Sequence, residues 1–300
     1  MRSKWISQVR ARRAPSRRAF TLIALLVVIA VIALLTAILM PTLQRVRRQG
    51  KAVVCQSNLR QWGTMFSAYM TEHNGSCWSN AWIPWGDNWT RWIETTRPYC
   101  RGDEKVRLCP MANKLPDPPV TSADHACYGG KSFAWGWILH AGGPDEWLAY
   151  SSYGHNWAVV DATHVKAFTD PISATEWRAF AWTPLTATTP GRIPVLFDCA
   201  RPDSTLFDKL PPPDFDAPPQ FDYNPPSGER TPTQARFVCM DRHDSGINSL
   251  FLDWSVRRVG LKELWTLKWS RDFDTAGSWT RAGGVKPEDW PAWMRRFKDY

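Results

Sequence analysis

The sequence of 300 residues is long enough for one membrane-spanning helix and one sizeable globular domain. Its formal net charge is +9, but 11 of the 37 Lys and Arg residues lie before position 52, where there is no acidic residue. The rest of the chain is therefore close to neutral. This basicity fits membrane topology and contact with lipid headgroups, and it argues against a nucleic-acid-binding protein.

Residues 20–40 are predicted to cross the membrane. They form an uncharged run of 21 mostly apolar residues, including Phe20, Leu25, Val28 and Leu34, that ends before Pro41. As a helix this run is ~31 Å long, enough for a hydrocarbon core of ~30 Å. An ordinary signal anchor or a cleaved secretory signal is the simpler alternative. The apolar run is longer than that of a signal peptide and lacks a small-x-small site after it, so cleavage at its far end is not expected.

Residues 1–19 form a basic leader with seven Lys or Arg residues and no acid. The positive-inside rule then keeps the N-terminus in the cytoplasm. We therefore expect a single-pass protein of the inner (cytoplasmic) membrane, with the C-terminal domain in the periplasm or outside the cell.

The basic leader, Ala19 and the apolar run that starts at Phe20-Thr21-Leu22-Ile23 resemble the N-terminal segment of type IV prepilins and type II secretion pseudopilins. The resemblance implies that prepilin peptidase cuts between Ala19 and Phe20 and that Phe20 becomes the methylated first residue. Pro41 stands where the family has a helix-kinking proline. One position departs from the pattern, because Ala24 replaces the usual Glu at the fifth mature residue. A minor or tip-like subunit, or a protein that uses the segment only as an anchor, fits this departure better than a major pilin.

Residues 41–75 are predicted to continue the helix beyond the membrane. Phe20 to His73 would then form one kinked helix about 80 Å long. Asn74-Gly75 is a stop signal. Apolar side chains along one face are expected to pack on the globular domain: Leu43, Val46, Val53, Leu59, Trp62, Phe66 and Tyr69.

Several motifs beyond the membrane segment resemble those of large bacterial families of pseudopilin-like proteins. The first is Cys-x-x-Asn-Leu-Arg-Gln, with Cys55, Asn58, Leu59 and Gln61, and the second is Cys109-Pro110. Residues 151–156 resemble a Ser-Tyr-Gly-x-Asn stretch. His243 and Asp253, separated by nine residues, resemble a C-terminal His-x9-Asp-Gly signature in which Trp254 replaces Gly. Since Gly tolerates positive φ and Trp does not, this replacement puts the tight turn in question.

Residues 76–270 are predicted to form an α+β head with a small antiparallel sheet and long loops, which together with the long helix makes a pilin-like fold. Strands are expected at 157–160, 176–182 and 193–199, with a hairpin of 247–252 and 255–259 and a helix at 261–269. Nine prolines between 202 and 232 predict an extended surface excursion. Residues 271–300 are set apart as a C-terminal tail.

Seven cysteines lie beyond the membrane segment, where an oxidising compartment permits disulfides. Their pairing is left open by the sequence, and the odd number leaves at least one thiol over. No Cys-x-x-Cys pair occurs, so zinc and redox motifs have no support along the sequence.

The 19 Trp residues are unusual, and Trp82, Trp85, Trp89 and Trp92 follow at helical spacing. They could stack on sugars, but we favour core packing.

A glycoside hydrolase would need a carboxylate pair, for which Asp198, Asp203 and Asp208 are candidates. Gly-x-Ser-x-Gly, His-Glu-x-x-His and phosphate-loop motifs are absent from the sequence. We therefore expect a protein that is not an enzyme.

A structural calcium ion is the one cofactor that the sequence suggests. Asp241, Asp244 and Asp253, with His243, supply oxygen-rich loops near the C-terminus. Their spacing fits no EF-hand, and turn capping explains them as well, so no bound metal is expected.

These features predict a pseudopilin-like subunit or accessory of a type II secretion or type IV pilus-like assembly. Its expected partners are prepilin peptidase, other pseudopilins or secretion-platform membrane proteins, and the lipid bilayer. The alternative is a membrane-anchored surface protein whose Trp-rich domain binds or hydrolyses a polysaccharide.

Overall fold

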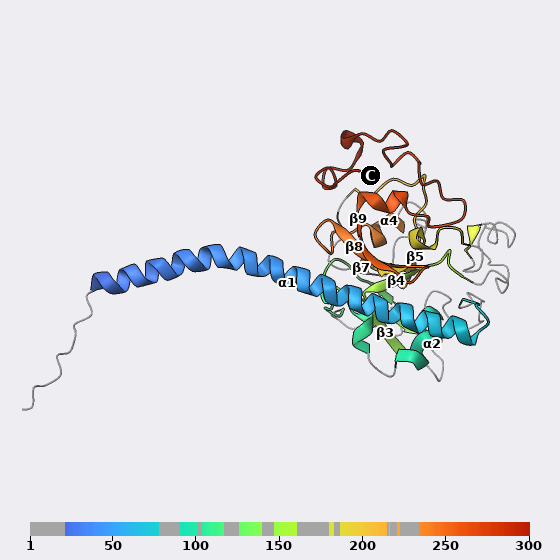
Figure 1. Ribbon diagram of the computed structural model, residues 1–300, viewed down its shortest axis with the longest axis horizontal. Coiled ribbons are helices and arrows are strands. Elements are labelled where there is room, and N and C mark those ends of the chain that lie inside the picture. The colour runs from blue at the N-terminus through green and yellow to red at the C-terminus, as the bar shows by residue number, and fades with distance from the viewer. Residues whose placement is uncertain are drawn as a thin grey trace, which may run out of the picture. The chain divides into compact units, whose positions relative to one another are not determined.

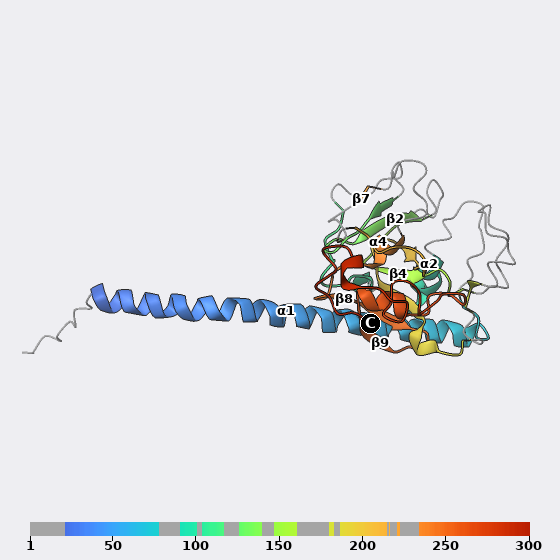
Figure 2. The same cartoon turned by 90° about the horizontal axis from the view of Figure 1, so that it is seen from above.

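The computed structural model describes residues 22–77, 91–100, 104–116, 126–139, 147–160, 180–182, 187–214, 216, 221–222 and 234–300. The chain forms two compact units, Met1–Arg47 and Arg48–Tyr300. The leader, including Ala19, and Phe20 lie outside the described residues. Figures 1 and 2 show the helices and strands in two perpendicular views.

Helix α1, Leu22–Glu72, has 51 residues and continues through Pro41. It is the one helix in the described part of the chain that is long and apolar enough to cross a membrane, and its most apolar 18-residue window has a mean hydropathy of 2.7. Leu25, Val28 and Leu34 are exposed along it, as lipid-facing side chains must be. The hydroxyl of Thr36 donates to the carbonyl of Ile32 at 2.9 Å, which satisfies this polar group within the helix.

In the second unit, α1 buries one face from Cys55 onward. Leu59, Trp62 and Phe66 are fully buried. Trp62 Nε1 donates to the carbonyl of Val106 at 3.0 Å, and the amide of Gln56 donates to Asn248 Oδ1 at 3.1 Å. This buried face explains why the helix persists outside a membrane.

The prediction that the apolar stripe packs on the head is wrong at Val53. Val53 is exposed, because the side chains of α1 that reach the core of the second unit begin at Cys55. The predicted stop is confirmed. Asn74 and Gly75 adopt φ of 54° and 79°, and the Gly75 amide donates back to the Met70 carbonyl at 2.7 Å.

The strands form two sheets. The four-stranded sheet has the order β3-β2-β1-β7 and is antiparallel, with β1 Ala126–Tyr128, β2 Trp135–Leu139, β3 Trp147–Ser151 and β7 Phe221–Asp222. The five-stranded sheet has the order β6-β4-β5-β8-β9, with β4 Tyr153–Asn156, β5 Pro194–Asp198, β6 Asp203–Ser204, β8 Gly246–Phe251 and β9 Val256–Gly260. Within it only β4 and β6 pair in parallel.

The remaining helices in the described part of the chain are short. They are α2 Arg91–Thr96, α4 Gln234–Val238 and the 3₁₀ helices Arg97–Cys100, Glu104–Arg107, Pro190–Arg192, Lys262–Thr266 and Pro287–Asp289. The helix predicted at 261–269 is thus a single 3₁₀ stretch of five residues. It buries Leu264 and Trp265, so core packing rather than helical length accounts for its apolar pattern.

The hairpin is confirmed as β8 and β9, and the strand expected at 193–199 is β5. The strand predicted at 157–160 is wrong, because the chain turns there after β4. Asn156 Oδ1 accepts from the Ala158 amide at 3.1 Å, and this local bond ends the strand. Residues 176–179 lie outside the described residues, whereas Trp182 forms an isolated bridge with Val159.

Two C-terminal expectations also change. The surface excursion predicted from residue 202 starts inside the head, where β6 and Leu206 are buried. The segment from 271 to 300 contributes Phe273, Trp290 and Met294 to the core. Trp293 Nε1 donates to the Pro213 carbonyl at 2.9 Å, so these two stretches hold each other against the head.

Tryptophan side chains are prominent in the core. Among the described residues, six Trp side chains are fully enclosed: Trp62, Trp92, Trp135, Trp265, Trp269 and Trp290. Several pack edge to face, such as Trp62 with Trp92, whose ring centroids lie 5.1 Å apart. The described part of the chain is thus an α+β fold in which a long N-terminal helix precedes two sheets, as a pilin-like fold requires.

Candidate functional site

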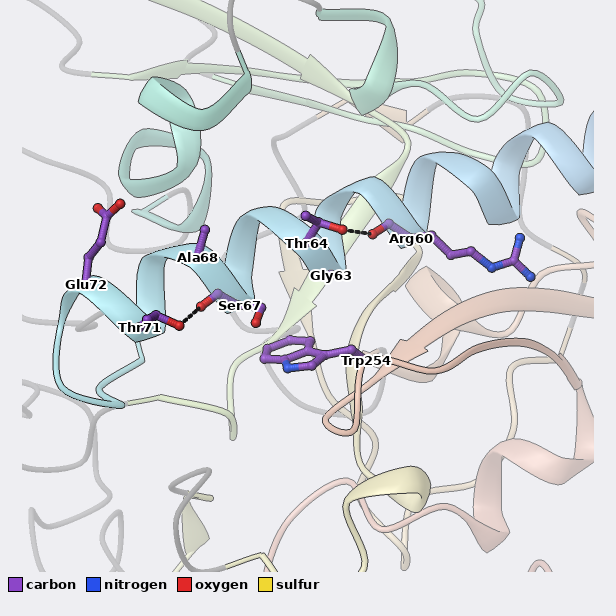
Figure 3. A pocket seen from close by; sticks show the side chains of 8 residues that line it. All are labelled: Arg60, Gly63, Thr64, Ser67, Ala68, Thr71, Glu72 and Trp254. Atoms are coloured by element: carbon purple, nitrogen blue, oxygen red, sulfur yellow. Dashed lines mark hydrogen bonds between the residues drawn. The ribbon is translucent and has the colours of Figure 1, made fainter.

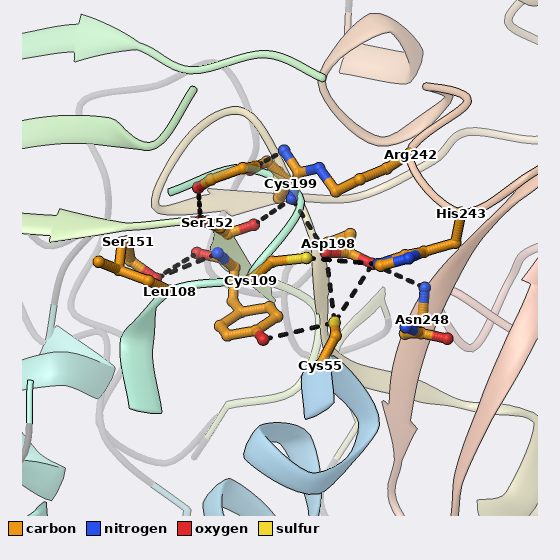
Figure 4. Close-up of polar contacts among 12 residues, drawn as sticks. Cys55, Leu108, Cys109, Ser151, Ser152, Asp198, Cys199, Arg242, His243 and Asn248 are labelled. Atoms are coloured by element: carbon orange, nitrogen blue, oxygen red, sulfur yellow. Dashed lines mark hydrogen bonds and ion pairs between the residues drawn. The ribbon is translucent and has the colours of Figure 1, made fainter. Parts of the chain in front are cut away.

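Three side chains predicted from three separate motifs meet in one buried cluster. Cys55 comes from α1, Cys109 follows the 3₁₀ helix Glu104–Arg107, and His243 precedes β8. They are joined by Asp198 at the end of β5. Figure 4 shows these four side chains converging from four parts of the chain.

The donor atoms of the cluster are close together. His243 Nε2 lies 3.4 Å from Cys109 Sγ and 3.1 Å from Asp198 Oδ2. Cys55 Sγ lies 3.8 and 3.9 Å from the two oxygens of Asp198. All four ligand-type atoms fall within 4.8 Å of one another, and the four residues are buried.

Asp198 is held by groups around the cluster. Arg242 Nη1 donates to Oδ1 at 3.0 Å, and the backbone N–H of Asn248 donates to Oδ2 at 2.8 Å. Arg242 is itself fixed by bonds to the carbonyls of Ser152 and Gly130, each at 2.6 Å. The carboxylate therefore has a defined orientation toward the sulfur atoms.

The surroundings shift the acid strengths strongly. Burial alone would raise the pKa of Asp198, but His243 and Arg242 outweigh it and hold that pKa well below the usual range. Burial raises the pKa of Cys55. Burial would also raise the pKa of Cys109, but hydrogen bonds with Cys55 and His243 lower it. Burial would lower the pKa of His243, yet Asp198 raises it. The cluster thus stabilises negative charge on the carboxylate and on one sulfur.

The helix motif has a structural explanation. Asn58 Nδ2 donates to the Leu108 carbonyl at 3.0 Å, beside Cys109. Leu59 is in the core, whereas Gln61 is exposed and Pro110 is half-buried. Cys55, Asn58 and Leu59 therefore share the face of α1 that seats the helix next to the Cys109 segment.

The three acids proposed for calcium are engaged separately. Asp241 Oδ1 accepts from the Ser245 amide at 2.6 Å, and its Oδ2 lies 3.2 Å from Arg296. Asp244 is exposed and 3.7 Å from Arg48. Within the described ranges, the one group of at least three ligand-type side chains is the cluster around Asp198.

The turn between β8 and β9 forms despite the replacement of Gly by Trp254. Trp254 adopts a φ of 63°, the conformation that Gly takes readily. Asp253 Oδ1 accepts from the Ser255 amide at 2.9 Å and so stabilises the turn. Packing of Trp254 against Phe66, with centroids 6.4 Å apart, offsets the backbone strain.

The carboxylates considered for hydrolysis are not displayed for a substrate. Asp198 and Asp203 are both buried. Asp203 lies 3.1 Å from Arg201 Nη2, and burial raises its pKa to about 6. Asp208 is half-buried in a turn. Trp82, Trp85 and Trp89 lie outside the described residues, while Trp92, Trp265 and Trp269 are core side chains.

An open groove runs along the exposed face of the last turns of α1. Figure 3 shows Trp254 facing the small side chains of this stretch across the groove. Its lining consists of Arg60, Gly63, Thr64, Ser67, Ala68, Thr71, Glu72 and Trp254. The groove lacks the concentration of charged and ligand-type groups seen in the buried cluster.

Sequence reasoning named Cys55, Cys109 and His243 but not their proximity. It assigned Asp198 to a different site and did not single out Arg242. The available signal was the position of Asp198, directly after the apolar strand Val195-Leu196-Phe197. A charged residue at the end of a buried strand needs a partner, and Arg242 beside His243 supplies it.

The fold and the apolar helix define a membrane-anchored α+β protein of pilin-like architecture. Residues 15–40 match the model of the prokaryotic N-terminal methylation motif. This match confirms the prepilin-type character predicted for the segment around Ala19 and Phe20. Comparisons with curated proteins and with solved structures find no match.

Proposed function

We propose that this chain is a pseudopilin-like subunit or accessory of a type II secretion or type IV pilus-like assembly. Prepilin peptidase cuts between Ala19 and Phe20, and Phe20 is N-methylated. The methylation motif at residues 15–40 and the long helix that follows it support this proposal. The N-terminus then faces the cytoplasm, and the head works in the periplasm or outside the cell.

The observation that carries the proposal is apolar surface on α1 beyond the predicted membrane span. Leu43, Val46, Val53 and Val54 are between 46% and 62% exposed. They follow Pro41, whereas residues 20–40 already suffice for a bilayer of ~30 Å. Apolar side chains repeated along one exposed helix are typical of a surface that a partner covers. Helices of neighbouring subunits are the partners of matching shape and polarity.

Ala24 supports a minor position in such an assembly. A carboxylate at this position would neutralise the amino terminus of a neighbouring subunit in lipid, where an unpaired charge is costly. A chain with Ala here provides no such partner. It suits a tip, an initiation complex or an accessory contact, where a subunit does not repeat along the filament.

The work of the head is structural and interactive rather than catalytic. Asp198 and His243, an acid and a base whose pKa values are both shifted by their surroundings, are enclosed by the fold. Their contacts are with Arg242, Asn248 and the two cysteines, in an arrangement that consolidates the core.

The test is site-specific photocrosslinking in membranes that contain the secretion or pilus machinery. A photoreactive residue is placed at Val46 or Val53, and a matched one at Lys286, an exposed position on the head. We expect adducts with another pilin-like subunit or a platform protein from the two helix positions and none from Lys286. Equal labelling from all three, or none from the helix, would contradict the proposal. Retention of the detergent-solubilised chain on a polysaccharide, lost with Trp82→Ala, would favour the alternative function.

A further inference from the structure

We propose that the buried cluster is a structural site for one thiophilic divalent cation, zinc being the ion that its donors fit best. The four ligands are Cys55 Sγ, Cys109 Sγ, Asp198 Oδ2 and His243 Nε2. This inference concerns the stability of the head and is independent of its role in a secretion assembly.

Three distances between ligand atoms are close to those in a closed coordination shell, and all four atoms lie within 4.8 Å of one another. In a tetrahedral zinc site, with Zn–S near 2.3 Å and Zn–N or Zn–O near 2.0–2.2 Å, neighbouring ligand atoms are about 3.3–3.8 Å apart. Here Cys109 Sγ and His243 Nε2 are 3.4 Å apart, and Nε2 is 3.1 Å from Asp198 Oδ2. Cys55 Sγ is 3.9 Å from the same oxygen. Shifts of a few tenths of an ångström would bring these three distances to the tetrahedral values.

The donor types select the ion. Two sulfurs and an imidazole nitrogen suit zinc, whereas calcium takes oxygen ligands only. The four side chains offer one donor each, which is the number that closed structural zinc sites use. A four-ligand site leaves no position for water or substrate, in agreement with the burial of all four residues.

Neighbouring groups orient the ligands, as outer-shell partners do in zinc proteins. Arg242 donates to Oδ1 of Asp198 and the Asn248 backbone N–H donates to Oδ2, which lies 3.1 Å from His243 Nε2. The Tyr153 hydroxyl lies 3.4 Å from Cys55 Sγ. The ligand geometry is therefore set by the fold before a metal arrives.

The charges also balance. Two thiolates and one carboxylate carry three negative charges, and a divalent cation with the Arg242 guanidinium carries three positive charges, while the imidazole is neutral. A completely buried site tolerates this arrangement because no net charge is left in the low-dielectric interior.

The sequence positions explain why spacing rules miss the site. The ligands lie at residues 55, 109, 198 and 243, and each belongs to a different segment. A bound ion would tie α1 to the segment before Pro110, to the end of β5 and to the turn before β8. Zinc binding would thereby contribute directly to the folding free energy of the head.

The test is metal analysis of the full chain, extracted in detergent without chelator. We expect inductively coupled plasma mass spectrometry to find about one zinc ion per chain. Cys109→Ser and His243→Ala should lose at least about nine-tenths of it. Cys239→Ser is the matched control, because this thiol is buried outside the cluster, and it should retain the metal.

Cobalt substitution of the wild-type chain gives a readout that does not depend on how the variants fold. A thiolate-to-cobalt charge-transfer band in the near ultraviolet, with tetrahedral d–d bands in the visible, is expected. A folded wild-type chain without metal and without these bands after cobalt loading would overturn the proposal. Peptide mapping that finds a Cys55–Cys109 disulfide in that chain would overturn it in favour of a covalent link. Full metal retention by folded Cys109→Ser would overturn it as well.

Discussion

Arg242 donates from Nη1 to Oδ1 of Asp198 over 3.0 Å, and both side chains are completely buried. The pair links the turn before β8 to the end of β5. Its other bonds, to the carbonyls of Ser152 and Gly130, connect the two sheets at the same point. A buried ionic network therefore lies within the apolar core, and we expect the stability of the head to depend on it.

Removing the cation of this pair should be severely destabilising. Arg242→Ala leaves the Asp198 carboxylate buried with one fewer partner, and we expect a loss of about 3–5 kcal/mol in the free energy of unfolding. Arg296→Ala is the control, because its bond to Asp241 is exposed and should contribute at most about 1 kcal/mol. Denaturant unfolding of the full chain in detergent measures both. A loss below about 1 kcal/mol for Arg242→Ala would show that the network contributes little to the stability of the head.

His155 should make the head sensitive to acid. Burial lowers its pKa to about 3 in the folded state, from an ordinary value near 6.5. The unfolded chain binds a proton below pH 6.5 while the folded chain does not, so stability present at neutral pH is lost as the pH falls. The loss from this residue is about 3 kcal/mol between pH 7 and pH 4.

The measurement for His155 is the free energy of unfolding against pH for the wild type and His155→Gln. Over this window, the free energy of unfolding of the variant should depend less steeply on pH, by the equivalent of about one bound proton. Identical slopes for the two proteins would mean that His155 is already protonated or exposed in the folded state.

Two Gly→Ala substitutions should change the stability of the protein in opposite directions. A Cβ on Gly154 would lie 2.5 Å from the Arg201 carbonyl oxygen and 2.6 Å from Cys199 Cβ, so Gly154→Ala should cost about 1–3 kcal/mol or more. A Cβ on Gly50 would meet nothing within 4 Å, and Gly50→Ala should stabilise the helix by up to about 1 kcal/mol. Melting temperatures report both effects. Equal shifts would mean that the tight packing at Gly154 does not exist.

The energetic cost of the backbone strain at Trp254 can be measured by comparing two substitutions that remove its ring. Both Trp254→Ala and Trp254→Gly lose the packing on Phe66, but only Gly takes the φ of 63° without strain. We therefore expect Trp254→Gly to be more stable than Trp254→Ala by about 1 kcal/mol in denaturant unfolding. The reverse order would indicate that the turn changes conformation once the ring is removed.

The local elements with a strong physical signal were predictable from the sequence. The membrane helix, the stop at Asn74-Gly75 and the hairpin of β8 and β9 each follow from apolar periodicity or from turn residues. The strand at 157–160 and the longer helix at 261–269 were wrong because apolar residues needed for the core resemble strand and helix patterns, and because Asn156 caps a turn after β4.

The site was predictable only as separate pieces. Cys55, Cys109 and His243 each stood out in a motif, but their meeting depends on the order of β5 and β8 in the sheet and on the face of α1 that packs there. Asp198 could not be assigned to them, since its partners Arg242 and Asn248 lie more than 40 residues away. Long-range pairing of this kind follows from tertiary packing and not from local propensity.

Processing as a prepilin-type protein underlies the proposed function. Its most direct test is the intact mass and N-terminal sequence of the membrane-extracted protein, from cells with and without prepilin peptidase. We expect a mature chain that starts at N-methylated Phe20 when the peptidase is present and an uncut leader when it is absent. An uncut chain that starts at Met1 in both cells would contradict it.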